Sequence, residues 1–414
     1  MANLTLTQAW LSGVILLVLP PFPSRRIKGY RTPGMDGLGR LFYYVPSSLL
    51  AKPARRDYGI EMFLAVLVSS VATRTRQKSL EDLSNKIAVV TGTTLSGTSG
   101  IGRYTATCLA ALGASVYVTA PDLPECREGF NAAVQDLLSL EQKIARGGSI
   151  QFHPLDLSDI QGIFHSSQDL RETFQKSGIS GIDILVCNAG ILGAPLREMS
   201  KDGYNKTFAV NCLGHFTWIN CLLDLVQKSA DKTQDARIIL TSSEGYAIAS
   251  KIDYAQLQTK PPGDNAGYFD AAAIFQRYCT SKLAILYMAM ELDRILRSAG
   301  ISHVFVNAIH PGRAGQTGIM EIENRLMGVR ALRWFKAIAS LGYRLNHSLQ
   351  DAAKTGIFMA ASSRIRDEDI HGQYWVVSTA FRLTSPHWLQ YSGSVREELT
   401  PLAADESEQA GDEQ

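Results

Sequence analysis

The chain has 414 residues, of which 45% are hydrophobic, so it can bury a sizeable core, and its formal net charge is only +2. Its six cysteines include no Cys-x-x-Cys pair and no nearby histidine at zinc-ligand spacing, so we predict reduced thiols, no metal site and no disulfide framework. We expect no nucleic-acid partner.

The first element in chain order is an apolar and basic segment, residues 1–80. It carries 11 Lys and Arg against 3 Asp and Glu, a net charge of +8, whereas the rest of the chain has 30 against 36, a net charge of −6. The apolar run Trp10–Phe22 is followed directly by basic residues, and it lacks the preceding charge and the cleavage site of a secretory signal. A second apolar run, Met62–Val68, is also followed by basic residues.

We therefore predict that residues 1–80 are a hydrophobic helical extension that attaches the protein to a membrane. The catalytic domain would face the cytosol, at the endoplasmic reticulum in a eukaryote. Because the first run is shorter than the ~20 residues that span a bilayer, an interfacial or re-entrant segment stays open beside a true span. The alternative is that both runs are helices packed on a cytoplasmic enzyme. At the other end, residues 396–414 are acidic without an apolar period, which predicts a disordered tail.

Between these ends, residues 81–395 alternate short apolar runs with longer helical stretches. The runs that we predict to be buried strands are Ile87–Val90, Ser115–Val118, Ile182–Val186, Arg237–Leu240 and His303–Val306. Such alternation is typical of βαβ units, so we predict one α/β domain with a Rossmann-type, doubly wound parallel sheet. Ligands bind such sheets at the carboxyl ends of the strands, and the polar motifs of this chain follow its strands.

A glycine-rich turn follows the first predicted strand and leads into a helix that continues from Arg103. The turn runs from Thr91 to Gly102 and also contains Gly92, Gly97 and Gly100. Glycines let the backbone approach a pyrophosphate, and a helix amino terminus offers free N–H groups and a positive dipole. The turn is therefore a candidate nucleotide-phosphate site.

Further motifs follow in a fixed order: Asn188-Ala189-Gly190, the serine pair Ser242-Ser243, and then Tyr278 and Lys282. Residues four apart on a helix share one face, so the ammonium of Lys282 can lie near the phenol of Tyr278. Each motif alone is weak. Their order indicates a nicotinamide-dependent oxidoreductase.

With these motifs, the chain from about Lys86 to Val377 resembles the short-chain dehydrogenase/reductase family. The stretches Tyr278–Ala284 and Gly372–Trp375 resemble its retinol-dehydrogenase-like branch. The glycine turn differs from the family's Thr-Gly-x-x-x-Gly-x-Gly pattern by a four-residue insertion. The catalytic tetrad that the resemblance implies is Asn211, Ser243, Tyr278 and Lys282.

In that tetrad Tyr278 is the acid or base, and Ser243 polarises the substrate oxygen. Lys282 hydrogen-bonds the nicotinamide ribose, and Asn211 holds a water in a proton relay to it. If the register shifts by one residue, Ser242 takes the place of Ser243.

The resemblance also implies a cofactor site and a coenzyme. The residues it implies are Thr91, Gly92, Gly97, Gly100, Ile101, Gly102, Asp122, Asp156, Asn188, Ala189, Gly190, Tyr278, Lys282, Pro311, Gly312 and Thr317. In the family, an acidic residue after the second strand binds the ribose of NAD, or a basic residue there binds the 2′-phosphate of NADP. Here Asp122 and Arg127 both lie later in the chain than those positions. We predict NADP, with Arg103 or Arg127 near the 2′-phosphate, and keep NAD, read by Asp122, as the alternative.

The stretch Thr317–Asn346 is rich in Met, Leu, Trp and Phe, and in the family this region covers the substrate site. An apolar lid beside a membrane extension predicts a lipophilic substrate such as a steroid, retinoid, terpenoid, polyketide or acyl chain. Two alternatives stay open: a nucleotide-binding scaffold without turnover, and a soluble biosynthetic ketoreductase. A homodimer also stays open, because family members often pair through long helices.

Overall fold

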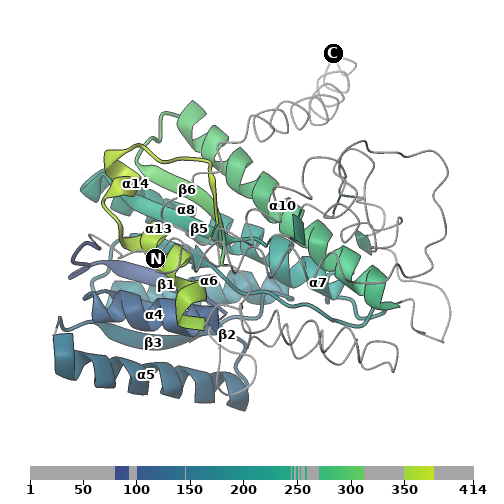
Figure 1. The fold of residues 1–414 in the computed structure, drawn as a ribbon, viewed down its shortest axis with the longest axis horizontal. Helices are drawn as coiled ribbons and strands as arrows, with labels where there is room; N and C mark the ends of the chain where they lie inside the picture. The colour runs from purple at the N-terminus through teal and green to yellow at the C-terminus, as the bar shows by residue number, and fades with distance from the viewer. Residues whose placement is uncertain are drawn as a thin grey trace, which may run out of the picture. The chain divides into compact units, whose positions relative to one another are not determined.

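Seven parallel strands form one sheet in the order β3-β2-β1-β4-β5-β6-β7 in the computed structural model (Figure 1). The strands are β1 Ile87–Thr91, β2 Ser115–Ala120, β3 Ser149–Pro154, β4 Ile184–Cys187, β5 Ala236–Thr241, β6 Val304–His310 and β7 Tyr374–Val376. The helices are α4 Ile101–Ala111, α5 Pro124–Ile144, α6 Ile160–Lys176, α7 Lys206–Phe208, α8 Gly214–Thr233, α10 Asp270–Ser298, α13 Leu349–Ala361 and α14 Arg364–Asp367, with a π-helical turn, η1 Ala209–Leu213, between α7 and α8.

The structure describes residues 80–92, 100–144, 146–243, 270–311 and 349–376, together with 245, 246, 249, 252, 257 and 258. The predicted membrane extension up to residue 79, the lid stretch and the acidic tail lie outside the described residues. So do three of the predicted cofactor residues, Gly97, Gly312 and Thr317.

The doubly wound parallel sheet confirms the predicted fold class. The five predicted strands correspond to β1, β2, β4, β5 and β6, in which almost every residue is buried. The prediction did not mark β3 or β7 among the buried runs. At the sheet edge, only Ile150 and His153 of β3 are buried, so this strand has no continuous apolar run, and β7 is only three residues long.

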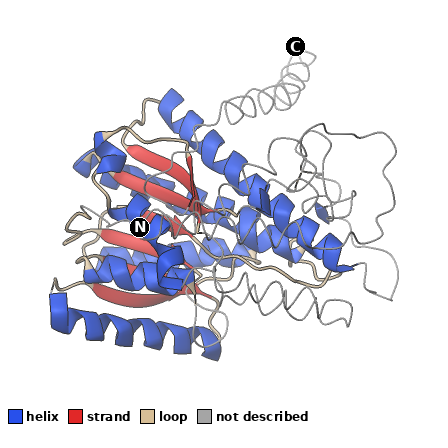
Figure 2. Cartoon of the chain, in the orientation of Figure 1, coloured by secondary structure: helices blue, strands red, loops and turns tan. Residues whose placement is uncertain are grey.

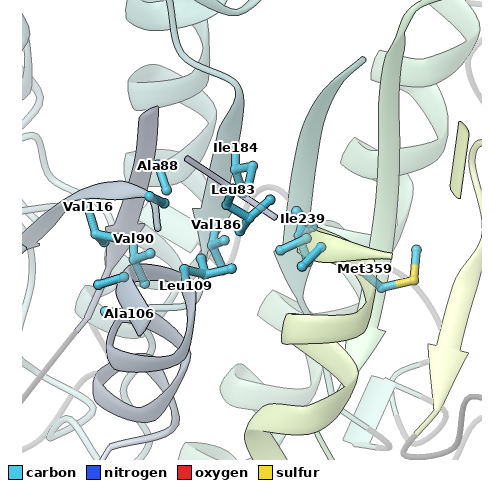
Figure 3. Close-up of a cluster of buried hydrophobic side chains, with 14 of the residues drawn as sticks. Leu83, Ala88, Val90, Ala106, Leu109, Val116, Ile184, Val186, Ile239 and Met359 are labelled. Atoms are coloured by element: carbon cyan, nitrogen blue, oxygen red, sulfur yellow. The ribbon is translucent and has the colours of Figure 1, made fainter. Parts of the chain in front are cut away.

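Helices cover both faces of the sheet (Figure 2). On one face α4 packs against α5 and α13, and on the other α6 packs against α8. Figure 3 shows side chains of β1, α4 and β4, among them Val90, Leu109 and Val186, meeting in one buried cluster. Fully burying each such side chain contributes roughly 1.5–3 kcal/mol, so this core holds β1 and α4 together.

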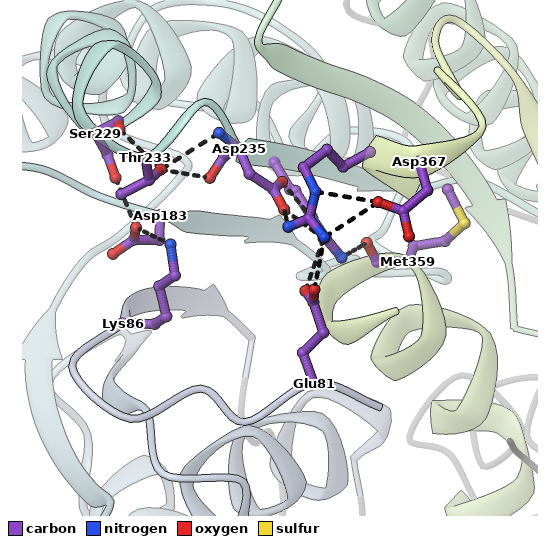
Figure 4. Close-up of polar contacts among 10 residues, drawn as sticks. Glu81, Lys86, Asp183, Ser229, Thr233, Asp235, Met359 and Asp367 are labelled. Carbon is purple, nitrogen blue, oxygen red and sulfur yellow. Dashed lines mark hydrogen bonds and ion pairs between the residues drawn. The ribbon is translucent and has the colours of Figure 1, made fainter. Parts of the chain in front are cut away.

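Charged residues tie the start of the described chain to the amino-terminal end of β5 (Figure 4). Arg237 is 3% exposed at its side chain, and its Nη2 lies 2.7 Å from Asp235 and 3.3 Å from Glu81. Arg366 reaches the same two carboxylates, at 3.2 Å and 3.0 Å. The Glu81 backbone N–H also donates to Ala361 O at 2.8 Å. The segment that follows the predicted extension is therefore anchored at the end of the sheet opposite the polar motifs.

One described helical stretch, Lys206–Thr233, is long and apolar enough to cross a membrane by length and composition. It comprises α7, η1 and α8, and 61% of its most apolar window is buried inside the fold. Its hydropathy is therefore accounted for by its packing in the core.

Candidate active site

The sheet order changes direction between β1 and β4, since β2 and β3 lie on one side of β1 and the remaining strands on the other. Three of the predicted motifs follow β1, β4 and β5: the turn that begins at Gly92, the turn Asn188–Gly190, and Ser242-Ser243. Open α/β sheets bind ligands at such a switch point, outside the carboxyl ends of the strands. The topology therefore brings these motifs to one end of the sheet.

The turns after β1 and β4 pack backbone against backbone. Gly92 has a φ of +74°, and a Cβ there would lie 2.8 Å from the Cβ of Ala189. A Cβ on Gly102, in the first turn of α4, would overlap the carbonyl oxygen of Gly92 and lie 2.6 Å from Asn188 Nδ2. Asn188 Nδ2 itself donates to the carbonyl oxygens of Thr91 and Gly92, each at 3.1 Å. Only glycine fits the two close approaches at Gly92 and Gly102.

The amino terminus of α4 is well suited to an anion. Its N-cap residue, Gly100, has no side chain to satisfy the first N–H groups, and the first turn, which starts at Ile101, carries no acidic residue. Uncapped N–H groups and the positive end of the helix dipole favour a phosphate. Together with the glycine contacts, this arrangement fits the pyrophosphate of a dinucleotide.

Tyr278 and Lys282 lie on α10, where the ammonium nitrogen of Lys282 is 5.6 Å from the centre of the Tyr278 ring. Lys282 is 2% exposed, and its Nζ donates to the carbonyl oxygen of Thr241, at the end of β5, at 2.8 Å. Burial lowers the pKa of Lys282 to about 8. The lysine is thus a buried cation fixed between the sheet and the tyrosine.

Asn211 lies in η1, is fully buried, and uses its whole side chain to hold neighbouring segments. Its Oδ1 accepts from the N–H of Ile191 at 2.7 Å, and its Nδ2 donates to Ile191 O at 3.0 Å and to Ser281 Oγ at 2.9 Å. Gly190 faces both Lys282 and Asn211, because a Cβ on it would lie 3.2 Å from Lys282 Nζ and 3.5 Å from Asn211 Oδ1. The structure therefore brings Asn211, Gly190 and Lys282 together.

The two serines after β5 point in different directions. Ser242 is buried, and its Oγ donates to the carbonyl oxygen of Lys282 at 2.8 Å. Ser243 is only partly buried, and its Oγ accepts from the N–H of Gly245 at 3.2 Å. A Cβ on Gly245 would lie 3.6 Å from both Ser243 Oγ and the Tyr278 ring, which places Ser243 on the tyrosine side.

The residues considered for coenzyme choice are already paired. Arg127 forms an ion pair with Asp122 at 2.6 Å, and Arg103 forms one with Asp136 at 2.6 Å. Asp156, one of the predicted cofactor residues, accepts at its Oδ1 from the backbone and side chain of Ser158, at 2.8 Å and 2.7 Å.

Two further results complete the comparison with the predicted site. Pro311 is buried directly after β6. Within the described part of the chain, no group of three His, Cys, Asp or Glu residues could hold a metal ion.

His215, a buried polar residue of this region, was not among the predicted site residues. It lies in the first turn of α8, where its ring contacts both Thr91 and Asn211. Its spacing of four residues from Asn211 places the two on one helix face, and that spacing was the available signal.

The chain is similar to several known proteins. Residues 86–254 match the family model of the short chain dehydrogenases. Human retinol dehydrogenase 13 is 32% identical over 256 residues, which are 60% of this chain and 65% of that protein, so the match spans just under two thirds of it. Human polyprenol dehydrogenase is 28% identical over 330 residues, covering 78% of this chain and 87% of that protein. The NADP active-site complex of Pseudomonas aeruginosa RhlG has 26% identity and a TM-score of 0.48, covering 73% of this chain and 98% of that one.

Proposed function

The chain belongs to the short-chain dehydrogenase family, retinol-dehydrogenase-like branch, and we propose that it transfers a hydride between NADP(H) and the carbonyl/alcohol pair of a lipophilic molecule. One observation carries this proposal. Tyr278, Lys282, Asn211 and Ser243 gather at the switch point of the sheet, beside helix α4, whose N-cap residue, Gly100, makes no side-chain cap hydrogen bond. A scaffold that only bound a nucleotide would have no need of a buried cation beside a phenol.

The residues divide the chemistry between them. The bound nicotinamide would supply or accept the hydride. Tyr278 gives a proton to the substrate oxygen in reduction and takes it back in oxidation. A free phenol has a pKa near 10, so action near pH 7 needs about 4 kcal/mol of preferential stabilisation of the phenolate. The buried charge of Lys282 supplies part of it, and Ser243 donates a hydrogen bond to the substrate oxygen.

Asn211 would hold the water of a proton relay to Lys282 through its backbone. Its side chain is fully used by Ile191 and Ser281. Its backbone carbonyl oxygen accepts from Nδ1 of His215 at 2.9 Å. We propose this carbonyl oxygen as the acceptor that binds the water.

An apolar wall beside Tyr278 supports a lipophilic substrate. Tyr278 belongs to a hydrophobic cluster whose partly exposed members are Leu196, Tyr246, Ile252, Phe275 and Tyr287. Apolar walls with a few polar groups at one end suit an alcohol or aldehyde on a long hydrocarbon. The names of the relatives, retinol and polyprenol dehydrogenase, point to the same class.

A substrate series tests the function. The full-length protein in detergent would be assayed with NADPH and aldehydes of increasing chain length, including retinal and a polyprenal, with a short water-soluble ketone as the control. We expect kcat/KM to rise at least about tenfold from the short ketone to the long aldehydes. Tight coenzyme binding without turnover of any member would favour the scaffold alternative.

For the coenzyme we propose NADP, read by Arg127. The Asp122–Arg127 pair would have to open, with the guanidinium turning to the 2′-phosphate, because a phosphate offers a stronger bidentate partner than one exposed carboxylate. Arg127→Ala should weaken NADPH binding about tenfold and leave NADH binding unchanged, as measured by fluorescence titration. Arg103→Ala is the matched comparison. If wild type binds NADH as tightly as NADPH, Asp122 is the reader and the proposal is wrong.

We also propose that residues 1–80 attach the enzyme to a membrane with the catalytic domain on the cytosolic side. The support is the +8 charge beside two apolar runs and the lipophilic substrate class.

A further inference from the structure

A buried histidine, His215, links the turn Asn188–Gly190 after β4, here called the cofactor turn, to the catalytic Asn211. His215 is 1% exposed, with its Nδ1 2.9 Å from the carbonyl oxygen of Asn211 and its Nε2 2.8 Å from Thr91 Oγ1. The same hydroxyl accepts the backbone N–H groups of Asn188 at 2.9 Å and Ala189 at 3.0 Å. A continuous chain of hydrogen bonds therefore runs from the turn after β4, through Thr91 and His215, to Asn211.

The direction of each bond follows from counting donors. A carbonyl oxygen only accepts, so Nδ1 of His215 must carry the hydrogen. Burial lowers the pKa of His215 to about 4, so the ring is neutral near pH 7 and Nε2 is an acceptor. Thr91 must then donate its O–H to Nε2, and its two lone pairs receive the two backbone N–H groups. Each atom of the chain has a partner in this single arrangement.

We propose that His215 is a positioning residue that holds the cofactor turn and the catalytic Asn211 in one fixed register. One arm, through Thr91, fixes the turn that ends at Gly190, which faces Lys282. The other arm holds the backbone of Asn211, whose side chain bonds Ser281 on α10. The inference rests on the proposed function, because it assigns a task within the same site.

Two amide variants separate the two arms. In His215→Gln the amide oxygen can accept from Thr91 as Nε2 does, but the donor to Asn211 is lost. In His215→Asn the shorter amide can donate to Asn211 as Nδ1 does, but the acceptor for Thr91 is lost. Coenzyme Kd by fluorescence titration and kcat at saturating coenzyme report on the two ends independently.

We expect His215→Gln to keep the coenzyme Kd within about threefold of wild type and to lose at least about tenfold in kcat. His215→Asn should show the reverse, with the Kd raised at least about tenfold and kcat within about threefold. If both variants change Kd and kcat together by the same factors, or change neither, His215 only fills space and the proposal is wrong.

Nitrogen-15 NMR of the wild-type protein with labelled histidine tests the bond directions without any variant having to be active. The His215 signals, assigned by their absence in His215→Gln, should be those of a neutral ring with hydrogen on Nδ1. Hydrogen on Nε2, or a doubly protonated ring near pH 7, would overturn the arrangement. A wild type that shows this tautomer and binds coenzyme but has no turnover would refute the proposed function instead.

Discussion

Ser242 and Ser243 are neighbours in the chain, but their hydroxyl groups have different partners. Ser242 Oγ donates to the carbonyl oxygen of Lys282 and is buried, so it holds β5 to α10. Ser243 Oγ lies on the side of Tyr278. We therefore propose that Ser242 stabilises the fold and that Ser243 contacts the substrate.

The paired variants Ser243→Ala and Ser242→Ala test this division. Ser243→Ala should lower kcat roughly 100-fold, because a donor to the developing oxyanion is lost, with no change in Tm. Ser242→Ala should lower the free energy of unfolding by about 1 kcal/mol and keep most of the turnover. Steady-state kinetics and urea denaturation of both variants measure these effects. The opposite pattern would move the catalytic role to Ser242.

Lys282 should cost stability at neutral pH, since it is a buried cation whose pKa is lowered from its ordinary value of 10.5 to about 8. Between these two pH values the unfolded chain binds more protons than the folded protein, so stability rises with pH through that window. Below about pH 8 the buried charge lowers the free energy of unfolding by its full amount, about 3 kcal/mol from the difference in pKa.

Lys282→Met should therefore have a larger free energy of unfolding than wild type near pH 7, and it should lose turnover. We expect a gain of about 2 kcal/mol, because loss of the bond to Thr241 offsets about 1 kcal/mol. Urea denaturation near pH 7 and near pH 10 measures the difference. The gain should shrink toward the higher pH. A gain that grows with pH would mean that the lysine is not held as a buried cation.

At the scale of elements, the close approach of α4 to the end of β1 depends on Gly102. A Cβ there would overlap a backbone oxygen, which cannot move aside as a flexible side chain can. Gly356, on α13, is the matched control, because a Cβ there would meet Ile309 Cδ1 at an ordinary 3.4 Å.

Gly102→Ala should lose up to roughly 3 kcal/mol of stability and weaken coenzyme binding, because α4 must move away from the turn after β1. Gly356→Ala should be neutral or stabilise by up to about 1 kcal/mol, since alanine is the better helix former. Thermal unfolding and coenzyme titration of both variants give the answer. If Gly102→Ala and Gly356→Ala had the same stability and the same coenzyme affinity, the contact at Gly102 would not be tight.

The apolar runs predicted the central strands because those strands are buried on both faces, and their order predicted the fold. The spacing of Tyr278 and Lys282 predicted one helix face, which the structure confirms. The edge strand β3 was not predicted because only two of its six residues are buried. The Thr91–His215 hydrogen bond was not predicted because it joins residues 124 positions apart, whereas the spacing of His215 from Asn211 was a local signal. The pairing of Asp122 with Arg127 depends on side-chain orientation, which spacing alone leaves open.

At the scale of the whole molecule, residues 80–83 join the proposed membrane extension to the catalytic fold. Leu80 pairs with Ser362, Glu81 binds Arg237 and Arg366, and Leu83 is buried in the core. This short segment belongs structurally to the domain. A truncation must therefore keep it.

A chain that begins at Ser79 should fold, bind coenzyme and leave the membrane fraction, whereas one that begins at Asn85 should lose roughly 3 kcal/mol or more of stability. The second loses the burial of Leu83, worth roughly 2 kcal/mol, and removes a carboxylate from the buried Arg237. Fractionation with and without carbonate, together with thermal unfolding, measures both effects. A full-length chain that is soluble without detergent would contradict the membrane proposal.

We propose above all that this site transfers hydride with Tyr278 as the proton donor. NADPH deuterated at the transferable C4 position would be incubated with a long-chain aldehyde, and the alcohol analysed by mass spectrometry. We expect deuterium on the carbinol carbon with wild type, and less than about a tenth of that yield with Tyr278→Phe, although this variant still binds coenzyme. Transfer by Tyr278→Phe at the wild-type rate, or no transfer by a wild type that binds coenzyme, would contradict the claim.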